Sequence, residues 1–127
     1  MRFIIDSSAW IEYLEGSSKG EKVREILLNN NEVFVLTLMI AEVISKVKRK
    51  GGDFDLAFNA ITKNSKVIEI SQEIAKEAGL LHAEVRKKVK DFGLMDALIL
   101  ASAKKLKVNL LTNDSHFKGF KETVFIN

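Results

Sequence analysis

Four acidic side chains occupy positions in this sequence where carboxylates could act together. Asp6 directly follows an apolar run at residues 3–5, and Glu42 lies early in the segment TLMIAEVISKV. Asp96 is the only acid in the apolar segment LMDALILASA, and Asp114 follows another apolar run in LLTND. Carboxylate oxygens are the ligands that Mg²⁺ and Mn²⁺ prefer, whereas thiolate zinc sites need cysteine, which the chain lacks. The four acids therefore suit a site for Mg²⁺ or Mn²⁺, if the fold gathers them.

Apolar runs and helical patterns alternate along the chain and predict the elements that position these acids. Buried parallel strands are continuous apolar runs, and amphipathic helices repeat apolar residues every three to four positions. We expect strands at residues 3–5, 32–36, 66–70, 108–112 and 123–126. We expect helices at residues 8–15, 18–29, 38–50, 53–62, 72–89 and 95–106, with hydroxyl caps at Ser8, Thr37 and Ser71. Strands separated by helices predict a mainly parallel sheet in a three-layer α/β/α sandwich.

The order of these elements places all four acids at one edge of the sheet. In a β-α-β unit, the carboxyl end of a strand and the amino end of the following helix lie together, and open α/β sheets bind their ligands there. Asp6 and Asp114 follow strands, and Glu42 and Asp96 lie near the amino ends of helices. Like charges gathered at one edge repel each other unless a cation joins them.

Each acid also has a purely structural interpretation. Asp6 could cap the first helix, and Glu42 could form an exposed ion pair with Lys46, four residues later. Asp96 could be satisfied by free amides in the first turn of its helix, and Asp114 lies in turn-forming sequence. Topology favours the joint interpretation over the four separate ones, because it brings all four acids to the same place.

Taken together, these residues resemble the PIN domain family, and among its members the VapC-type toxin ribonucleases. The resemblance is carried by Asp6 with serine after it, by Glu42 in an early helix, by GLMDALILASA around Asp96 and by LLTNDSHF around Asp114. It covers essentially the whole chain, so residues 1–127 are interpreted as a single PIN-like domain. It implies a five-stranded sheet of order 3-2-1-4-5, in which the first and fourth strands are neighbours.

The resemblance also implies an activity, which is metal-dependent endoribonuclease cleavage. The family's catalytic and metal-holding acids are matched by Asp6, Glu42, Asp96 and Asp114. Its supporting polar positions are matched by Ser7, Ser8, Thr112 and Asn113. The implied reaction is hydrolysis of an RNA phosphodiester bond to 5′-phosphate and 3′-hydroxyl ends. Mg²⁺ or Mn²⁺ lowers the pKa of a water molecule, and a carboxylate can assist as general base.

Charge and the family resemblance together indicate the partners. The net charge is +3, and the remaining surface is more basic if the four acids are gathered at one site, which suits a polyanion. Contacts with RNA phosphates are expected from Lys46, Arg49, Lys50, Lys88 and Lys90. The resemblance implies a small antitoxin and a second copy of the chain as further partners. No membrane segment or signal peptide is expected, which predicts a cytoplasmic protein.

The two histidines and one further acid are assigned structural roles. His116 stands two residues after Asp114 but is assigned to a surface loop, and His82 to packing on its helix. Asp91 could serve as an outer acid, but a loop position without chemistry explains it better. No histidine or lysine base is therefore expected in the reaction.

Other classes of protein account for the same acids less completely. A phosphotransfer receiver needs an aspartate at the end of a later strand, and the second and third strands end without one. A haloacid-dehalogenase-like phosphatase needs an aspartate two residues after the first, where this chain has Ser8. A PIN-fold module that only binds RNA or protein, or a PIN nuclease of RNA processing outside a toxin–antitoxin system, remains the alternative.

Overall fold

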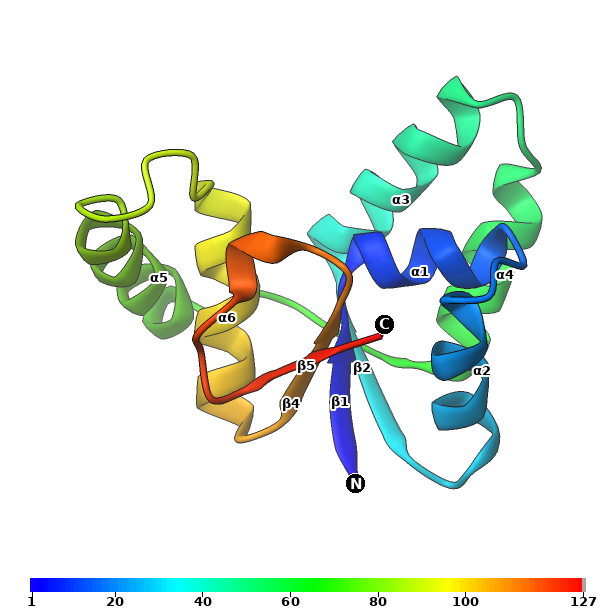
Figure 1. Cartoon of the computed structure of the whole chain (residues 1–127), viewed down its shortest axis with the longest axis horizontal. Helices are drawn as coiled ribbons and strands as arrows, with labels where there is room; N and C mark the ends of the chain where they lie inside the picture. Colours follow the sequence, from blue (N-terminus) through cyan, green and yellow to red (C-terminus); the bar gives the residue numbers. More distant parts are fainter. Residues whose placement is uncertain (127) are drawn as a thin grey trace.

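The computed structural model describes residues 1–126, in which five parallel strands form one sheet (Figure 1). The strand order is β3-β2-β1-β4-β5, as the family resemblance implies. The strands are β1 (Arg2–Ile5), β2 (Glu32–Leu36), β3 (Lys66–Ile68), β4 (Asn109–Thr112) and β5 (Thr123–Phe125). The chain reverses direction across the sheet between β3 and β4, so β1 and β4 are adjacent at the point where such sheets bind ligands.

Helices cover both faces of this sheet and make the predicted three-layer sandwich. They are α1 (Ser7–Leu14), α2 (Gly20–Leu28), α3 (Thr37–Arg49), α4 (Phe54–Asn64), α5 (Gln72–Val85) and α6 (Leu94–Leu106), with a short 3₁₀ helix, η1 (Ser115–Phe117). Figure 1 shows α5 and α6 on one side of the sheet and the first four helices on the other. Among the described residues, no helix has the length and apolar character needed to cross a membrane.

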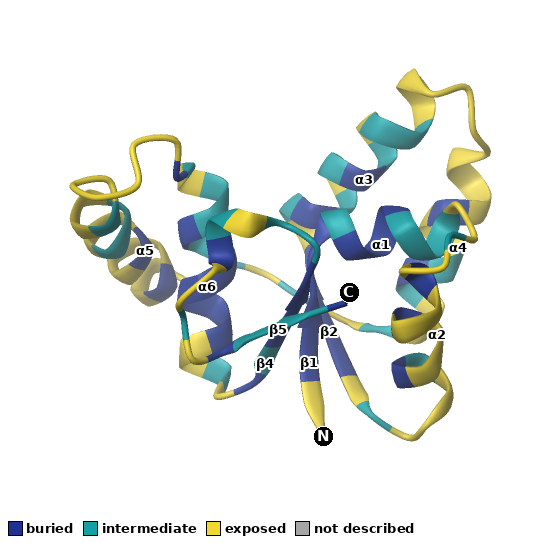
Figure 2. Cartoon of the chain, viewed as in Figure 1, coloured by how far each residue is buried: buried dark blue, intermediate teal, exposed yellow. Residues whose placement is uncertain are grey.

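The core lies on the three inner strands, β2, β1 and β4, and the helices packed against them (Figure 2). Ile4 and Ile5 of β1 and Leu110 of β4 are fully buried, as expected for strands covered on both faces. Trp10 of α1 and Leu100 of α6 are also fully buried and belong to the same core cluster. Burial on both faces holds the carboxyl ends of β1 and β4 firmly, so side chains that follow these strands start from fixed positions.

Two predicted helix caps are wrong. Asp6, rather than Ser8, caps α1, because α1 begins at Ser7 and the extended backbone of Asp6 lets its carboxylate accept the Ala9 N–H at 3.0 Å. Thr37 is the first residue of α3 rather than its cap, and the preceding Leu36 has no side-chain acceptor to offer. The cap at Ser71 is confirmed, since its hydroxyl accepts the Ile74 N–H at 3.1 Å.

The helix after Ser71 is shorter than predicted. Its apolar stripe was expected to reach Val89, but α5 ends at Val85 and Val89 is exposed. Three consecutive basic residues at 86–88 supply no apolar side chain to pack against α6, and the chain turns away from the helix there. The segment at residues 86–93 is therefore a loop that leads back to the sheet edge, and it carries Asp91 to the amino end of α6.

Candidate active site

The structure brings the four predicted acids to one edge of the sheet. Asp6 directly follows β1, and Asp114 lies two residues after β4. Asp96 is in the first turn of α6, and Glu42 is in the amino-terminal half of α3. Burial is the main cause that raises the pKa of Asp6 and Asp96, and nearby negative charge adds to it, from Asp114 at both groups and from Glu42 at Asp96. The topological argument from the order of the elements therefore places these residues correctly.

Asp6 is the most deeply buried of the four, with only 3% of its surface exposed. One carboxylate oxygen accepts the Ser8 hydroxyl at 2.7 Å and the Ala9 N–H, and the other accepts the Thr112 hydroxyl at 2.6 Å. Burial raises the pKa of Asp6 to about 6, although these hydrogen bonds favour the charged form and lower it. A carboxylate in this environment is held in one orientation and gains strongly from a nearby cation.

Two hydroxyl groups join the end of β1 to the end of β4. The fully buried Thr112 hydroxyl donates to Asp6 and accepts the Asp114 N–H at 2.9 Å. The Ser8 hydroxyl donates to Asp6 and accepts the Asn113 N–H at 3.0 Å. The backbone N–H of Asp6 also donates to the Leu111 carbonyl at 3.0 Å. Ser8, Thr112 and Asn113 thus lie beside the acids, where the sequence analysis expected supporting groups.

Glu42 is positioned from the start of α1. The buried Ser7 hydroxyl donates to a carboxylate oxygen of Glu42, which joins the amino ends of α1 and α3. Among residues 1–126, no ion pair joins Glu42 to Lys46, so the exposed helical pair considered as an alternative is not formed. Consecutive serines after Asp6 therefore contact two different acids of the edge.

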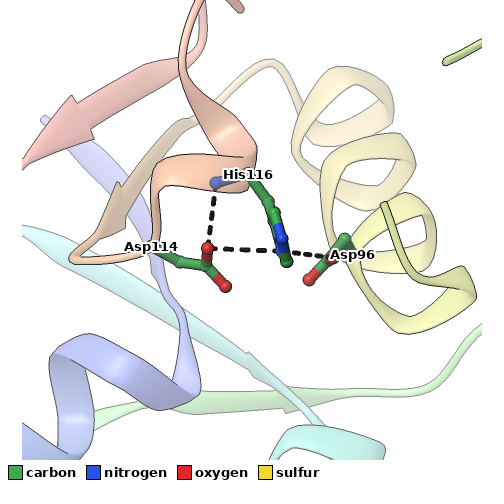
Figure 3. A group of neighbouring side chains, drawn as sticks. All are labelled: Asp96, Asp114 and His116. Carbon is green, nitrogen blue, oxygen red and sulfur yellow. Dashed lines mark hydrogen bonds and ion pairs between the residues drawn. The ribbon is translucent and has the colours of Figure 1, made fainter. Parts of the chain in front are cut away.

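Asp96 and Asp114 face each other across the ring of His116 (Figure 3). The Nδ1 atom of His116 lies 3.2 Å from Oδ2 of Asp96 and 3.4 Å from Oδ1 of Asp114. Asp114 caps η1 by accepting the His116 N–H at 2.9 Å, and Asp96 accepts the Gly93 N–H at 3.0 Å. Burial raises the pKa of Asp96.

The assignment of His116 to a surface loop is wrong. Its side chain is 30% exposed and points into the acidic edge, while its Nε2 atom lies 2.9 Å from Oδ2 of the exposed Asp91. This hydrogen bond raises the pKa of His116 and lowers the pKa of Asp91. The spacing of two residues from Asp114 was a usable signal, because η1 folds the ring back over that acid. Nothing local in the sequence pairs His116 with Asp91, 25 residues away.

Three predicted RNA-binding residues lie beside the acids. Lys46, Arg49 and Lys50 of α3 and its carboxyl end line an open groove of about 370 Å³, which also contacts Ser8 and Asn113 of the acidic edge. Lys50 is held by an ion pair of 3.0 Å with Glu15. The groove therefore lies between α1 and the basic face of α3, is also lined by Glu12, and meets the acidic edge at Ser8 and Asn113.

The other predicted basic residues lie on a different side of the edge. Lys88 and Lys90 are exposed in the loop that also carries Asp91. The sequence analysis missed Lys19, whose ammonium group donates to the Asn113 side chain at 3.4 Å. Lys19 precedes α2, and only the tertiary fold brings it next to the end of β4.

The donor set fits a divalent cation. Among residues 1–126, no ion pair joins any of the four acids to lysine or arginine, so the protein's own strong cations do not neutralise them. Ligand atoms of Asp96, Asp114 and His116 all lie within 4.8 Å of one another, and the electrostatically linked Asp6 and Glu42 complete the edge. Carboxylate oxygens with one imidazole can hold Mg²⁺ or a first-row transition ion.

The fold and this edge define a class of protein: a parallel α/β sandwich of strand order 3-2-1-4-5 with acids at its carboxyl edge. The sequence matches the family described as "PIN domain" over residues 3–122, and the chain belongs to that family. No match is found among curated protein sequences.

Solved structures that share this fold include toxins and toxin–antitoxin complexes. A toxin-antitoxin complex from Klebsiella pneumoniae aligns with a TM-score of 0.79 at 22% identity, over 98% of this chain and 97% of that one. VapBC2 from Rickettsia felis, bound to a promoter DNA fragment, aligns with a TM-score of 0.75 at 21% identity, over 98% and 97%. Mycobacterium tuberculosis VapC20, a toxin that cleaves the sarcin-ricin loop, aligns with a TM-score of 0.74 at 20% identity, over 94% and 97%.

Proposed function

We propose that this protein is a metal-dependent endoribonuclease and the toxin of a VapBC-type toxin–antitoxin pair. The observation that carries the proposal is the convergence of Asp6, Glu42, Asp96 and Asp114 at the carboxyl edge of a PIN domain, with no lysine or arginine paired to them in the described residues. A cluster of this kind is electrostatically unfavourable unless it holds a cation. Phosphodiester hydrolysis is the chemistry that such a cation serves in this family.

The residues of the edge would divide the work as follows. Asp6, Glu42, Asp96 and Asp114 would hold Mg²⁺ or Mn²⁺, which supplies Lewis-acid activation of water and neutralises charge on the phosphodiester. Ser8 and Thr112 hold Asp6 through short hydrogen bonds, so its oxygens need not reorganise during the reaction. The Ser7 hydroxyl positions Glu42 in the same way. Asn113, whose backbone N–H donates to the Ser8 hydroxyl, would hold a water molecule beside the acids.

RNA would enter along the basic groove. Lys46, Arg49 and Lys50 line it, and Asn113 and Ser8 join it to the acids, so a bound strand could reach the site with its phosphates on basic residues. Lys88 and Lys90 on the loop at residues 86–93 would contact the strand on the opposite side of the acids. In this arrangement the phosphates of a bound strand would lie on basic residues, and a cation would join one of them to the carboxylates.

The proposed partners follow from the same class of protein. A small antitoxin would cover the acidic edge in the resting cytoplasmic complex, and a second copy of the chain would form a homodimer. The support is the shared fold, since the similar structures from Klebsiella pneumoniae and Rickettsia felis are toxin–antitoxin assemblies.

The test is cleavage of single-stranded RNA with Mn²⁺, with Mg²⁺ and with a chelator. We expect cleavage only with metal, and a loss of roughly 10²-fold or more in Asp6→Asn and Asp96→Asn. Asp53→Asn is the matched control, because Asp53 caps α4 as Asp6 caps α1 but lies away from the acidic edge. Cleavage without metal, or full activity in both site variants, would refute the nuclease proposal, and RNA binding without cleavage would favour a binding module.

The toxin role needs a separate measurement. Expression of the wild-type chain in bacterial cells should arrest growth, and expression of Asp6→Asn should not. The arrest should be relieved by the small protein encoded beside it. Cleavage in vitro without growth arrest would instead assign this PIN nuclease to RNA processing outside a toxin–antitoxin system.

A further inference from the structure

The ring of His116 lies between the carboxylates of Asp91, Asp96 and Asp114. Its Nε2 atom lies 2.9 Å from Oδ2 of Asp91, which can only accept a hydrogen bond while ionised, so Nε2 carries a hydrogen. The opposite ring nitrogen, Nδ1, lies 3.2 Å from Asp96 and 3.4 Å from Asp114. One nitrogen thus points outward to the exposed carboxylate of Asp91. The other points into the acidic edge, between Asp96 and Asp114 (Figure 3).

This geometry matches the way histidine ligands are held in metal sites. A metal-binding imidazole usually donates its second N–H to a carboxylate, which fixes the tautomer and the ring orientation. In the neutral ring with hydrogen on Nε2, the lone pair of Nδ1 faces the same space as the Asp96 and Asp114 oxygens. In this tautomer, three electron-pair donors within 4.8 Å of one another repel unless a cation or a proton lies between them.

We propose that His116 is a nitrogen ligand of the cation at the acidic edge, that Asp91 is the positioning residue that orients its ring, and that this ligand favours first-row transition ions over Mg²⁺. The inference rests on the proposed function only for the presence of a divalent cation. Imidazole binds transition ions well, whereas Mg²⁺ strongly prefers oxygen ligands. A site with carboxylates alone would lack this discrimination.

The test measures metal binding rather than cleavage. Mn²⁺ alone is bound to the full chain, and pulsed electron paramagnetic resonance looks for coupling between the ion and a ¹⁴N nucleus of imidazole. We expect this coupling in the wild type and in His82→Gln, and its loss in His116→Gln. His82 is the matched control, because it is the only other histidine and lies against Phe92 with ring centroids 6.5 Å apart.

Competition between Mn²⁺ and Mg²⁺, followed by calorimetry, provides a second readout. His116→Gln should weaken Mn²⁺ binding by about tenfold or more while changing Mg²⁺ binding less, and Asp91→Ala should produce a smaller loss in the same direction. Thermal unfolding of each metal-free variant checks that it is folded. An unchanged Mn²⁺ to Mg²⁺ ratio in folded His116→Gln, or wild-type Mn²⁺ without nitrogen coupling, would overturn the inference.

These outcomes separate the inference from the proposed function. RNA cleavage by a protein whose Mn²⁺ shows no nitrogen coupling would refute the histidine ligand and leave the nuclease proposal standing. Nitrogen coupling in a protein that cleaves no RNA would support the ligand and refute the nuclease. Failure of the wild type to bind Mn²⁺ would overturn the histidine ligand, and failure to bind Mg²⁺ as well would overturn the nuclease proposal.

Discussion

Asp6 serves two structural demands at once. Its carboxylate caps α1 through the Ala9 N–H, and it also accepts the Thr112 and Ser8 hydroxyls at the end of the sheet. The cap interpretation and the site interpretation of this residue are therefore compatible rather than alternatives. Both carboxylate oxygens of Asp6 accept hydrogen bonds, yet burial still disfavours the charged form of this residue. If Asp6 only capped the helix, a neutral capping residue such as asparagine could stand in this place, because capping does not require a negative charge.

The unfolding free energy of the metal-free protein should depend on this carboxyl group. The pKa of Asp6 is about 6 in the folded protein, whereas the ordinary aspartate pKa of 3.8 applies in the unfolded chain. Between these values the folded state holds the extra proton, so stability falls as the pH rises through the window. The free energy of unfolding should therefore be about 3 kcal/mol lower at pH values above this window than at pH values below it.

Asp6→Asn isolates this contribution. Asparagine also caps helices, and it carries no charge. The free energy of unfolding of the variant should therefore not fall between about pH 5 and neutral pH as that of the wild type does. Urea unfolding in chelator at about pH 5 and about pH 7.5 measures both proteins, and the difference between their pH slopes reports Asp6 because other titrating groups cancel. Identical slopes would show that Asp6 titrates normally in the folded protein.

At the scale of elements, the sequence predicts the frame of the site better than its details. Continuous apolar runs identify the buried strands, and their alternation with helices dictates a parallel sheet, so the edge that collects the acids follows from topology alone. The exact start of a helix depends on which side chain reaches a free amide. Asp6 and Ser8 were equally suitable by type, and the extended backbone at Asp6 decides between them.

Contacts formed by the return of a loop could not be predicted. The stripe of α5 continues to Val89 by spacing, but the three basic residues at 86–88 do not pack, and the chain leaves the helix early. That early exit carries Asp91 to His116 and brings the ring over the acids. Sequence periodicity describes faces of single elements, whereas this contact depends on where two loops meet.

The junction of α1 and α2 offers a prediction at this scale. A Cβ atom built on Gly20 would lie 2.4 Å from the Glu12 carbonyl oxygen and 2.7 Å from the Tyr13 Cα atom. These are backbone atoms and cannot turn aside, so Gly20→Ala should destabilise the protein by about 1–3 kcal/mol or more by overpacking. Urea unfolding at constant pH gives the value.

Gly79→Ala is the matched control for this substitution. Gly79 lies inside α5, is exposed, and has no atom within 4 Å of the position of an added Cβ. Alanine should therefore stabilise the helix there by roughly 0.5–1 kcal/mol. Opposite signs for the two substitutions are expected, and a neutral Gly20→Ala would mean that α1 and α2 move apart at little cost.

At the scale of the whole molecule, charge is separated rather than mixed. The net charge of +3 combines a carboxylate cluster at the carboxyl edge of the sheet with basic residues on the surface around it. A second basic region lies at the opposite, amino edge, where Lys107 and Lys121 line another depression. The basic groove on α3 differs from that region in opening onto the acids, so the two regions provide an internal comparison for RNA binding.

The salt dependence of RNA binding should distinguish the two regions. In chelator, which prevents cleavage, the affinity for single-stranded RNA should fall with salt, and each phosphate contact contributes about 0.7 to the slope of log affinity against log salt. The double variant Lys46→Ala and Arg49→Ala should bind more weakly and lose about 1.4 from that slope, because two contacts are removed. Fluorescence anisotropy at several salt concentrations measures the slope.

Lys107→Ala with Lys121→Ala is the control, because it removes the same charge from the amino edge and should leave the slope close to wild type. Equal losses in both variants would mean that net charge alone attracts RNA, and that the groove beside the acids does not direct the strand.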